Sequence, residues 1–305
     1  MLLNTNSFLT ENKMKKMWTI VIAVLVASFS AFAQDSAHQH MEHMRFTAVE
    51  QDWAKQRADK SPRHQEWVSV KNGNRTVSCF VVYPEVKNKA TAVVVIHEIF
   101  GMSDWVRSLT DQLAEAGYIA IAPDLLSGMG PKGGGSAEFD RNAIGQAIRD
   151  LPPDQVTGDL NAAADYVAKL PACNGKVAVS GFCYGGSQTF RFATNRPTLK
   201  AAFVFYGSGP DDPAAIARIK CPVYGFYGGN DARINQTIPK SQELMKAAGK
   251  TYEPVTYEGA GHGFMRAGED PTASEATPEA KAMKDANKKA RDQAWVRWKS
   301  ILQKL

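Results

Sequence analysis

The chain has few cysteines and no motif of the kind that builds a disulfide scaffold. Its 305 residues include only Cys79, Cys173, Cys183 and Cys221, with no Cys-x-x-Cys pair. This spacing argues against a disulfide-rich fold and against the common structural zinc sites. We expect Cys79, Cys173 and Cys221 to be packed free thiols, and we leave a disulfide among them open. The Gly-rich segment 127–136 lacks the Gly-Lys-Ser/Thr ending of a phosphate loop, so we interpret it as a loop over strand ends.

The sequence also lacks a strong excess of charge of either sign. Lys and Arg number 36 against 31 Asp and Glu, which leaves a formal charge of +5. So small an excess favours no nucleic-acid partner. The composition is otherwise ordinary for a globular protein, with 44% hydrophobic residues.

A continuous apolar stretch near the N-terminus covers residues 18–29, which is short for a membrane span. It follows three lysines and precedes Ala-Phe-Ala at 31–33, the order that is typical of a secretory signal peptide. We expect residues 1–33 to be removed and the protein to be exported, to the periplasm or outside the cell, with no stable membrane insertion after cleavage. An uncleaved membrane anchor is the alternative.

The segment 34–60 is polar and contains His-Gln-His-Met-Glu-His-Met at 38–44. His38, His40 and His43 are residue types that bind soft or borderline metal ions. A polar tail near a new N-terminus is the other interpretation. We assign no metal site and no cofactor to the protein on this basis.

Residues 61–305 show strands alternating with helices. Two extended runs at 67–70 and 76–83 flank Asn-Gly-Asn, which predicts a hairpin. Short apolar runs follow between helical segments, at 91–96, 118–122, 177–180, 201–206, 223–227 and 254–257. Such alternation predicts an α/β fold, a mostly parallel sheet with helices on both faces. A long C-terminal helix carries an apolar stripe that we interpret as core contact.

The run 177–180 stops at Gly-Phe-Cys-Tyr-Gly-Gly, residues 181–186. Gly-x-Cys-x-Gly after a strand is typical of a nucleophile elbow, here with a thiol in place of the usual hydroxyl. Gly181 and Gly185 would let neighbouring backbone approach closely. We therefore predict that Cys183 is a nucleophile and that the backbone N–H of Tyr184 is an oxyanion donor. A buried structural thiol is the alternative.

A thiol nucleophile needs a base and a group that orients the base. His262 lies in a Gly-rich loop after the last predicted strand, and Asp231 follows the strand at 223–227. The chain order Cys183, Asp231, His262 is the nucleophile–acid–histidine order of α/β hydrolases. A surface histidine and a helix-capping aspartate are the alternatives. His97 ends a buried strand, where we expect a packed core histidine.

Four segments together resemble the dienelactone hydrolase family of the α/β-hydrolase superfamily, over residues 68–302. They are the Cys elbow, His-Glu-Ile-Phe-Gly at 97–101, Gly-Asn-Asp at 229–231 and Gly-His-Gly-Phe at 261–264. The resemblance implies that Glu98 contacts the resting thiol and helps to generate the thiolate. It also implies an oxyanion hole made by the N–H groups of Ile99 and Tyr184. Phe100 and Arg266 would then contact the substrate, with Arg266 on a carboxylate.

One departure from the family concerns the substrate. A second carboxylate-binding Arg is expected shortly after Asp124, but residues 126–129 read Leu-Ser-Gly-Met. We predict an exported, cofactor-free hydrolase of lactones or small carboxylic esters that forms a thioester on Cys183. Two alternatives stay open: a non-catalytic exported binding protein on the same fold, and metal handling by the N-terminal histidines. The partner is a small-molecule ester or lactone, and the oligomeric state is left open.

Overall fold

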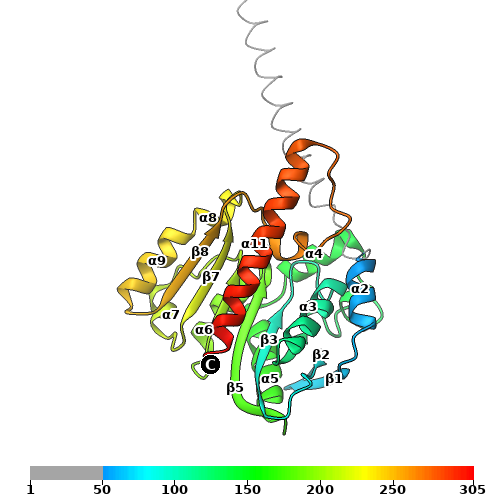
Figure 1. The fold of residues 1–305 in the computed structure, drawn as a ribbon. Helices are drawn as coiled ribbons and strands as arrows, with labels where there is room; N and C mark the ends of the chain where they lie inside the picture. The colour runs from blue at the N-terminus through cyan, green and yellow to red at the C-terminus, as the bar shows by residue number, and fades with distance from the viewer. Residues whose placement is uncertain (1–50) are drawn as a thin grey trace, which may run out of the picture. The chain divides into compact units, whose positions relative to one another are not determined.

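The computed structural model of the chain describes residues 51–305 (Figure 1). The predicted signal peptide and the histidines at 38, 40 and 43 lie outside the described residues. Within the described part, the compact unit is one mixed sheet with helices packed on it.

The sheet has eight strands in the order β1-β2-β4-β3-β5-β6-β7-β8. β1 and β2 form an antiparallel hairpin, β2 runs antiparallel to β4, and every pairing from β4 onward is parallel. This arrangement confirms the predicted fold class. The strands are β1 (Gln65–Asn72), β2 (Arg75–Val82), β3 (Ala90–Ile96), β4 (Ile119–Pro123), β5 (Cys173–Phe182), β6 (Ala202–Phe205), β7 (Val223–Gly228) and β8 (Tyr252–Tyr257).

Helices cover both faces of the sheet because its central strands are apolar on both sides. Successive residues of β3 point to opposite faces. Accordingly, Val93 and Val95 join one core cluster, whereas Val94 and Ile96 join the other. The first cluster lies under α2 (Asp52–Asp59), α3 (Asp104–Glu115), α10 (Phe264–Ala267) and α11 (Pro278–Leu302). The second lies under α4 (Arg141–Arg149), α5 (Pro153–Ala168), α6 (Tyr184–Asn195), α7 (Pro213–Ala217), α8 (Ala232–Asn235) and α9 (Ile238–Ala247).

Local signals explain where several helices begin. Ser103 caps α3 by accepting a hydrogen bond from the Val106 N–H at 3.4 Å. α4 begins at Arg141 because Asp140 caps it through the N–H groups of Asn142 and Ala143, at 2.9 Å each. The preceding residues 136–138 form a short 3-10 turn.

The C-terminal helix buries the apolar stripe predicted from its sequence. Trp298 and Leu302 are buried in the core, and Trp295 and Ile301 pack against it. In Figure 1, α11 crosses in front of the sheet. Because α11 packs on this face of the sheet, its apolar stripe is buried against the core.

Helix α2 lies before residue 61, where the sequence suggested a polar segment. Ala54 and Ala58 are buried, and the backbone N–H of Trp105 donates to the Gln51 side chain at 2.8 Å. Two alanines one turn apart leave room for α3 to approach closely, although the helix is polar overall. The packed unit therefore includes residues that precede the predicted domain start.

The four cysteines are free thiols. Cys79, Cys173 and Cys221 are buried, in agreement with the prediction of packed thiols. Burial raises the pKa of Cys79 to about 12, so this thiol is unreactive at neutral pH. In the described range 51–305, no helix is both long and apolar enough to cross a membrane.

Candidate active site

Cys183 occupies the turn between β5 and α6, as the elbow motif predicts. Its backbone has φ 56° and ψ −114°, which is a strained conformation for a residue with a side chain. Two backbone hydrogen bonds hold the turn. The Cys183 N–H donates to the Phe205 carbonyl at 3.1 Å, and the Ser187 N–H donates to the Cys183 carbonyl at 3.2 Å. Because β5 and β6 are rigid neighbours, the sulfur has a defined position above the strand ends.

Two glycines make this turn possible by allowing backbone to approach backbone. A Cβ on Gly181 would lie 2.1 Å from the Gly185 carbonyl oxygen. A Cβ on Gly185 would lie 2.2 Å from the Ile96 carbonyl oxygen. Neither distance is possible for a real side chain, so the glycines flanking the elbow are required by packing.

Asp231 and His262 come together from different strand ends. Asp231 follows β7 and His262 follows β8, and the His262 Nδ1 lies 2.5 Å from an Asp231 carboxylate oxygen. The other Asp231 oxygen accepts from the Ile234 N–H at 3.3 Å, so the residue also caps α8. The same carboxylate therefore caps α8 and bonds to the His262 imidazole.

The electrostatics of His262 depend on Asp231 and Cys183. Burial alone lowers the pKa of His262, but the hydrogen bond to Asp231 and the nearby Cys183 side chain outweigh burial and raise it to about 9. The second ring nitrogen, Nε2, is buried and has no hydrogen-bond partner within residues 51–305. The imidazole is thus held on one side by a carboxylate, and its other nitrogen is available to a reacting group.

Glu98, Phe100 and Arg266 form a second group of side chains. The Arg266 Nε donates to a Glu98 carboxylate oxygen at 2.7 Å, and Glu98 is only 2% exposed. The guanidinium carbon of Arg266 lies 5.3 Å from the centre of the Phe100 ring. Burial lowers the pKa of Arg266, but Glu98 outweighs burial and raises it, and Cys183 acts in the same direction. Cys183 therefore lies near both His262 and Arg266.

The two predicted oxyanion donors lie at the expected places in the chain. Tyr184 begins α6, and the N–H groups in the first turn of a helix have no acceptor within the helix. Ile99 follows Glu98 at the C-terminal end of β3 and lies outside regular structure. His97 is fully buried, as expected of a core histidine. Its Nε2 accepts from the Leu125 N–H at 3.3 Å, and its Nδ1 lies 2.8 Å from the Glu98 carbonyl.

Tyr206 belongs to this site but was not among the residues predicted from the sequence. It follows β6 with φ 41°, and its ring makes an edge contact with His262 at a centroid distance of 5.1 Å. Its hydroxyl is buried and has no hydrogen-bond partner in the described part of the chain. Burial raises the pKa of Tyr206 well above 10, and the Glu98 charge acts in the same direction. The sequence offered one signal for Tyr206. It is a polar residue directly after β6, and β6 is the neighbour of the strand that leads into the elbow.

Comparisons with known proteins identify the family. A family model described as "Dienelactone hydrolase family" matches residues 77–305. A protein of Methylorubrum extorquens named "Putative carboxymethylenebutenolidase" is 33% identical over 183 residues, which cover 56% of this chain and 62% of that relative. A Salmonella typhimurium protein of the same name is 31% identical over 209 residues, which cover 64% of this chain and 76% of the relative. The chain thus spans less than two thirds of the first relative.

A solved structure has the same overall arrangement. The crystal structure titled "Putative Dienelactone Hydrolase from Klebsiella pneumoniae" aligns with a TM-score of 0.66 and 25% identity, covering 80% of this chain and all of the other. The fold is accordingly an α/β-hydrolase fold. Because the family model covers about three quarters of the 305 residues, the chain belongs to the dienelactone hydrolase family.

Proposed function

We propose that the protein hydrolyses lactones or small carboxylic esters with Cys183 as the nucleophile, His262 as the acid–base and Asp231 as the orienting group. The observation that carries the proposal is the Asp231–His262 pair, 2.5 Å apart, beside a thiol on a strained elbow. This is the arrangement that covalent acyl transfer requires.

The reaction has two stages. The Cys183 thiolate attacks the substrate carbonyl, and the carbonyl electron pair moves to oxygen. When this tetrahedral species collapses, the C–O bond to the alcohol breaks, protonated His262 gives its proton to the leaving oxygen, and a thioester remains. His262 then takes a proton from water as the water attacks the thioester, and it returns the proton to the sulfur as the acid leaves.

The raised pKa of His262 fits the first stage. With a pKa of about 9, the imidazole carries its proton at neutral pH and stabilises a thiolate next to it. Asp231 bonds to Nδ1, which keeps Nε2 as the nitrogen that exchanges the proton. The Ile99 and Tyr184 N–H groups would stabilise the oxyanion, by about 3–4 kcal/mol per donor in the transition state.

Glu98 and Arg266 would connect substrate binding to thiol activation. Both are buried and bonded to one another, so a substrate carboxylate that binds Arg266 competes with Glu98. A Glu98 carboxylate released in this way could accept the thiol proton and pass it on to His262, which restores the thiolate and the protonated imidazole with which the first stage begins. At the place of the family's second Arg, Leu126 is fully buried and Ser127 donates to the Asp124 carbonyl at 2.5 Å. Arg266 is then the one cation of the two that the family pattern would place at the substrate, which supports a substrate with a single carboxylate or none.

Export is part of the proposal and rests on the sequence of residues 1–33. N-terminal sequencing of the protein recovered from a bacterial periplasmic extract tests it. Cleavage after Ala33 is the expected result, and an intact N-terminus in the cytoplasmic fraction would contradict export.

The central experiment measures hydrolysis of p-nitrophenyl acetate and a panel of lactones by the purified protein and by Cys183→Ala. We expect activity in the wild type and its complete loss in the variant, with an unchanged melting temperature. Intact-mass measurement after rapid quenching should show the acyl adduct on the wild type alone. Full activity in Cys183→Ala would refute the mechanism, and an inactive wild type across the panel would favour a non-catalytic binding protein.

A further inference from the structure

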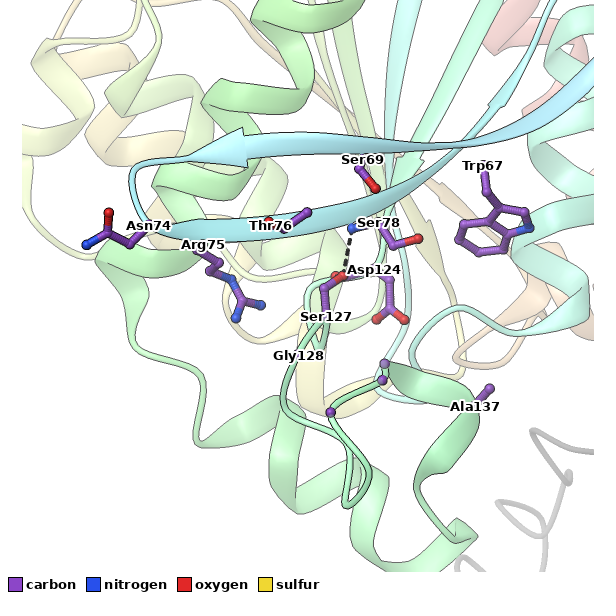
Figure 2. Close-up of a pocket in the computed structure, with 13 residues that line it drawn as sticks. Trp67, Ser69, Asn74, Arg75, Thr76, Ser78, Asp124, Ser127, Gly128 and Ala137 are labelled. Carbon is purple, nitrogen blue, oxygen red and sulfur yellow. Dashed lines mark hydrogen bonds between the residues drawn. The ribbon is translucent and has the colours of Figure 1, made fainter.

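A pocket of about 860 Å³ lies between the β1–β2 hairpin and the segment that follows β4 (Figure 2). This volume is within the range of small-molecule sites. Trp67 lies at one end of the pocket and Asn74 at the other, and Ser78 and Asp124 lie between them. Cys183, Asp231 and His262 do not line it.

The hairpin wall combines an aromatic platform with hydroxyl groups. Trp67 pairs with Phe80 across the strands, and Ser69 pairs with Ser78. Directly opposed residues of antiparallel strands share one face, so these four side chains lie in a row. Trp67 is 50% exposed and its ring is supported by Phe80 at a centroid distance of 5.3 Å. The indole therefore presents a fixed, solvent-accessible ring.

The charged side chains that line the pocket already have partners. Arg75 donates to Asp159 at 2.9 Å and to the Leu125 carbonyl at 2.8 Å. Asp124 accepts from the Ser136 N–H at 2.7 Å and from the Ser136 hydroxyl at 2.6 Å. The pocket consequently has no unpaired charge with which to select an ionic ligand.

Neutral polar groups, in contrast, are available. The side chains of Ser69, Ser78 and Asn74 make no hydrogen bond to any residue between 51 and 305. The Ser127 hydroxyl accepts from the Ser78 N–H at 2.9 Å, which joins the two walls (Figure 2). An entirely apolar ligand would desolvate these hydroxyl and amide groups without replacing their bonds to water.

The opposite wall is a glycine-rich loop with a preformed shape. Glu138 accepts from the N–H groups of Lys132 and Gly134, at 2.8 and 3.1 Å. A Cβ on Gly134 would lie 2.4 Å from the Glu138 carboxylate, and a Cβ on Gly135 would lie 2.1 Å from the Asp124 carboxylate. Glycine at both positions lets the loop backbone pack directly against the Glu138 and Asp124 carboxylates. Because Gly134 and Gly135 have no side chains, they do not fill the pocket in front of the hairpin.

We propose that this pocket binds a neutral polyhydroxylated ligand, a short oligosaccharide. The apolar face of one pyranose ring would stack on Trp67, because the ring C–H groups are attracted to the negative face of an indole. Sugar hydroxyls would bond with Ser69, Ser78 and Asn74. From Trp67 to the turn the strand is about 16 Å long, which accommodates several linked rings. The proposal does not depend on the chemistry at Cys183.

Isothermal titration calorimetry of the full chain with cellotetraose, maltotetraose and N-acetylchitotetraose tests the proposal. We expect at least one of these neutral sugars to bind. Trp67→Ala should weaken that binding about tenfold or more, and Trp67→Phe should recover most of it because a flat ring remains. Ser78→Ala should weaken it by a smaller factor. Val296→Ala, which changes an exposed apolar side chain on α11, should bind like the wild type.

Circular dichroism and the ester hydrolysis rate separate a binding effect from misfolding. Both should be unchanged in Trp67→Ala, since Trp67 is half exposed and lies outside the catalytic group. Absence of binding by all three sugars would overturn the proposal. So would equal binding by Trp67→Ala, or tighter binding of the acidic tetragalacturonate than of every neutral sugar.

Discussion

The aromatic ring of Tyr206 meets the imidazole of His262 edge-on, at a centroid distance of 5.1 Å and an interplanar angle of 64°. The tyrosine is fully buried, adopts a positive φ and has a hydroxyl without a hydrogen-bond partner in the described residues. Two unfavourable features at one residue indicate that the ring is retained for its position. The ring packs against His262, whose Nδ1 is held by Asp231.

Substitution of Tyr206 should separate the roles of its ring and hydroxyl. Tyr206→Phe removes an unpaired buried hydroxyl, so we expect the free energy of unfolding to rise by about 1 kcal/mol, with hydrolysis retained. Tyr206→Ala should lower it by roughly 3–5 kcal/mol and reduce kcat, because His262 loses a packing surface. Urea denaturation and steady-state kinetics measure both effects. A Tyr206→Phe variant that is less stable than the wild type would show that the hydroxyl is bonded in solution.

The elbow glycines should tolerate no side chain. In Gly185→Ala the new Cβ meets two carbonyl oxygens, those of Ile96 at 2.2 Å and His97 at 2.5 Å. Backbone of a central strand cannot move cheaply, so we expect a loss of at least about 3 kcal/mol of stability or a failure to fold. The matched control is Gly145→Ala in α4, where the nearest contacts of a Cβ begin at 3.5 Å. That variant should be as stable as the wild type or more so.

The Glu98–Arg266 pair should be costly to break from one side. Both side chains are nearly buried, and removal of one partner leaves a charge without compensation. We expect Arg266→Gln to lower the free energy of unfolding by roughly 3 kcal/mol, and Glu98→Gln/Arg266→Gln to lose less. Thermal denaturation of the two variants compares these values. Equal losses would indicate that Arg266 contributes mainly through its other contacts.

The raised pKa of His262 predicts how stability depends on pH. Its pKa is about 9 in the folded protein and about 6.5 in an unfolded chain, so folding favours the protonated ring. This stabilisation is complete below pH 6.5 and is lost as the pH rises to about 9. It amounts to roughly 3 kcal/mol. The difference in unfolding free energy between the wild type and His262→Gln, measured by urea titration from pH 5 to 10, should fall across this interval. A constant difference would contradict the raised pKa.

Much of the site follows from short-range sequence patterns. The strand, the glycines and Cys183 are contiguous, so the elbow can be recognised from that local order. Asp231 and His262 each follow an apolar run, and parallel strands bring their C-terminal ends to one edge of the sheet. Their juxtaposition was therefore predictable, although the 2.5 Å separation was not.

Other parts of the site depend on contacts between segments that are distant in the chain. Glu98 and Arg266 are 168 residues apart, and nothing in the sequence around either residue indicates that the two side chains bond to each other. Tyr206 looks like the last residue of an ordinary apolar strand until its ring is seen against His262. Helix α2 is polar in composition, and only two small buried side chains show that it belongs to the packed unit.

The sequence by itself determined the α/β architecture, the elbow and the position of the Cys183 thiol on it, because hydrophobic periodicity and glycine requirements act over a few neighbouring residues. Only the tertiary structure decided which charges pair, which hydroxyl is left without a partner and where a pocket opens beside the hairpin. These properties change when distances between remote segments differ by about an ångström. Burial also changes the energy of each charge, and the degree of burial cannot be deduced from a local sequence pattern.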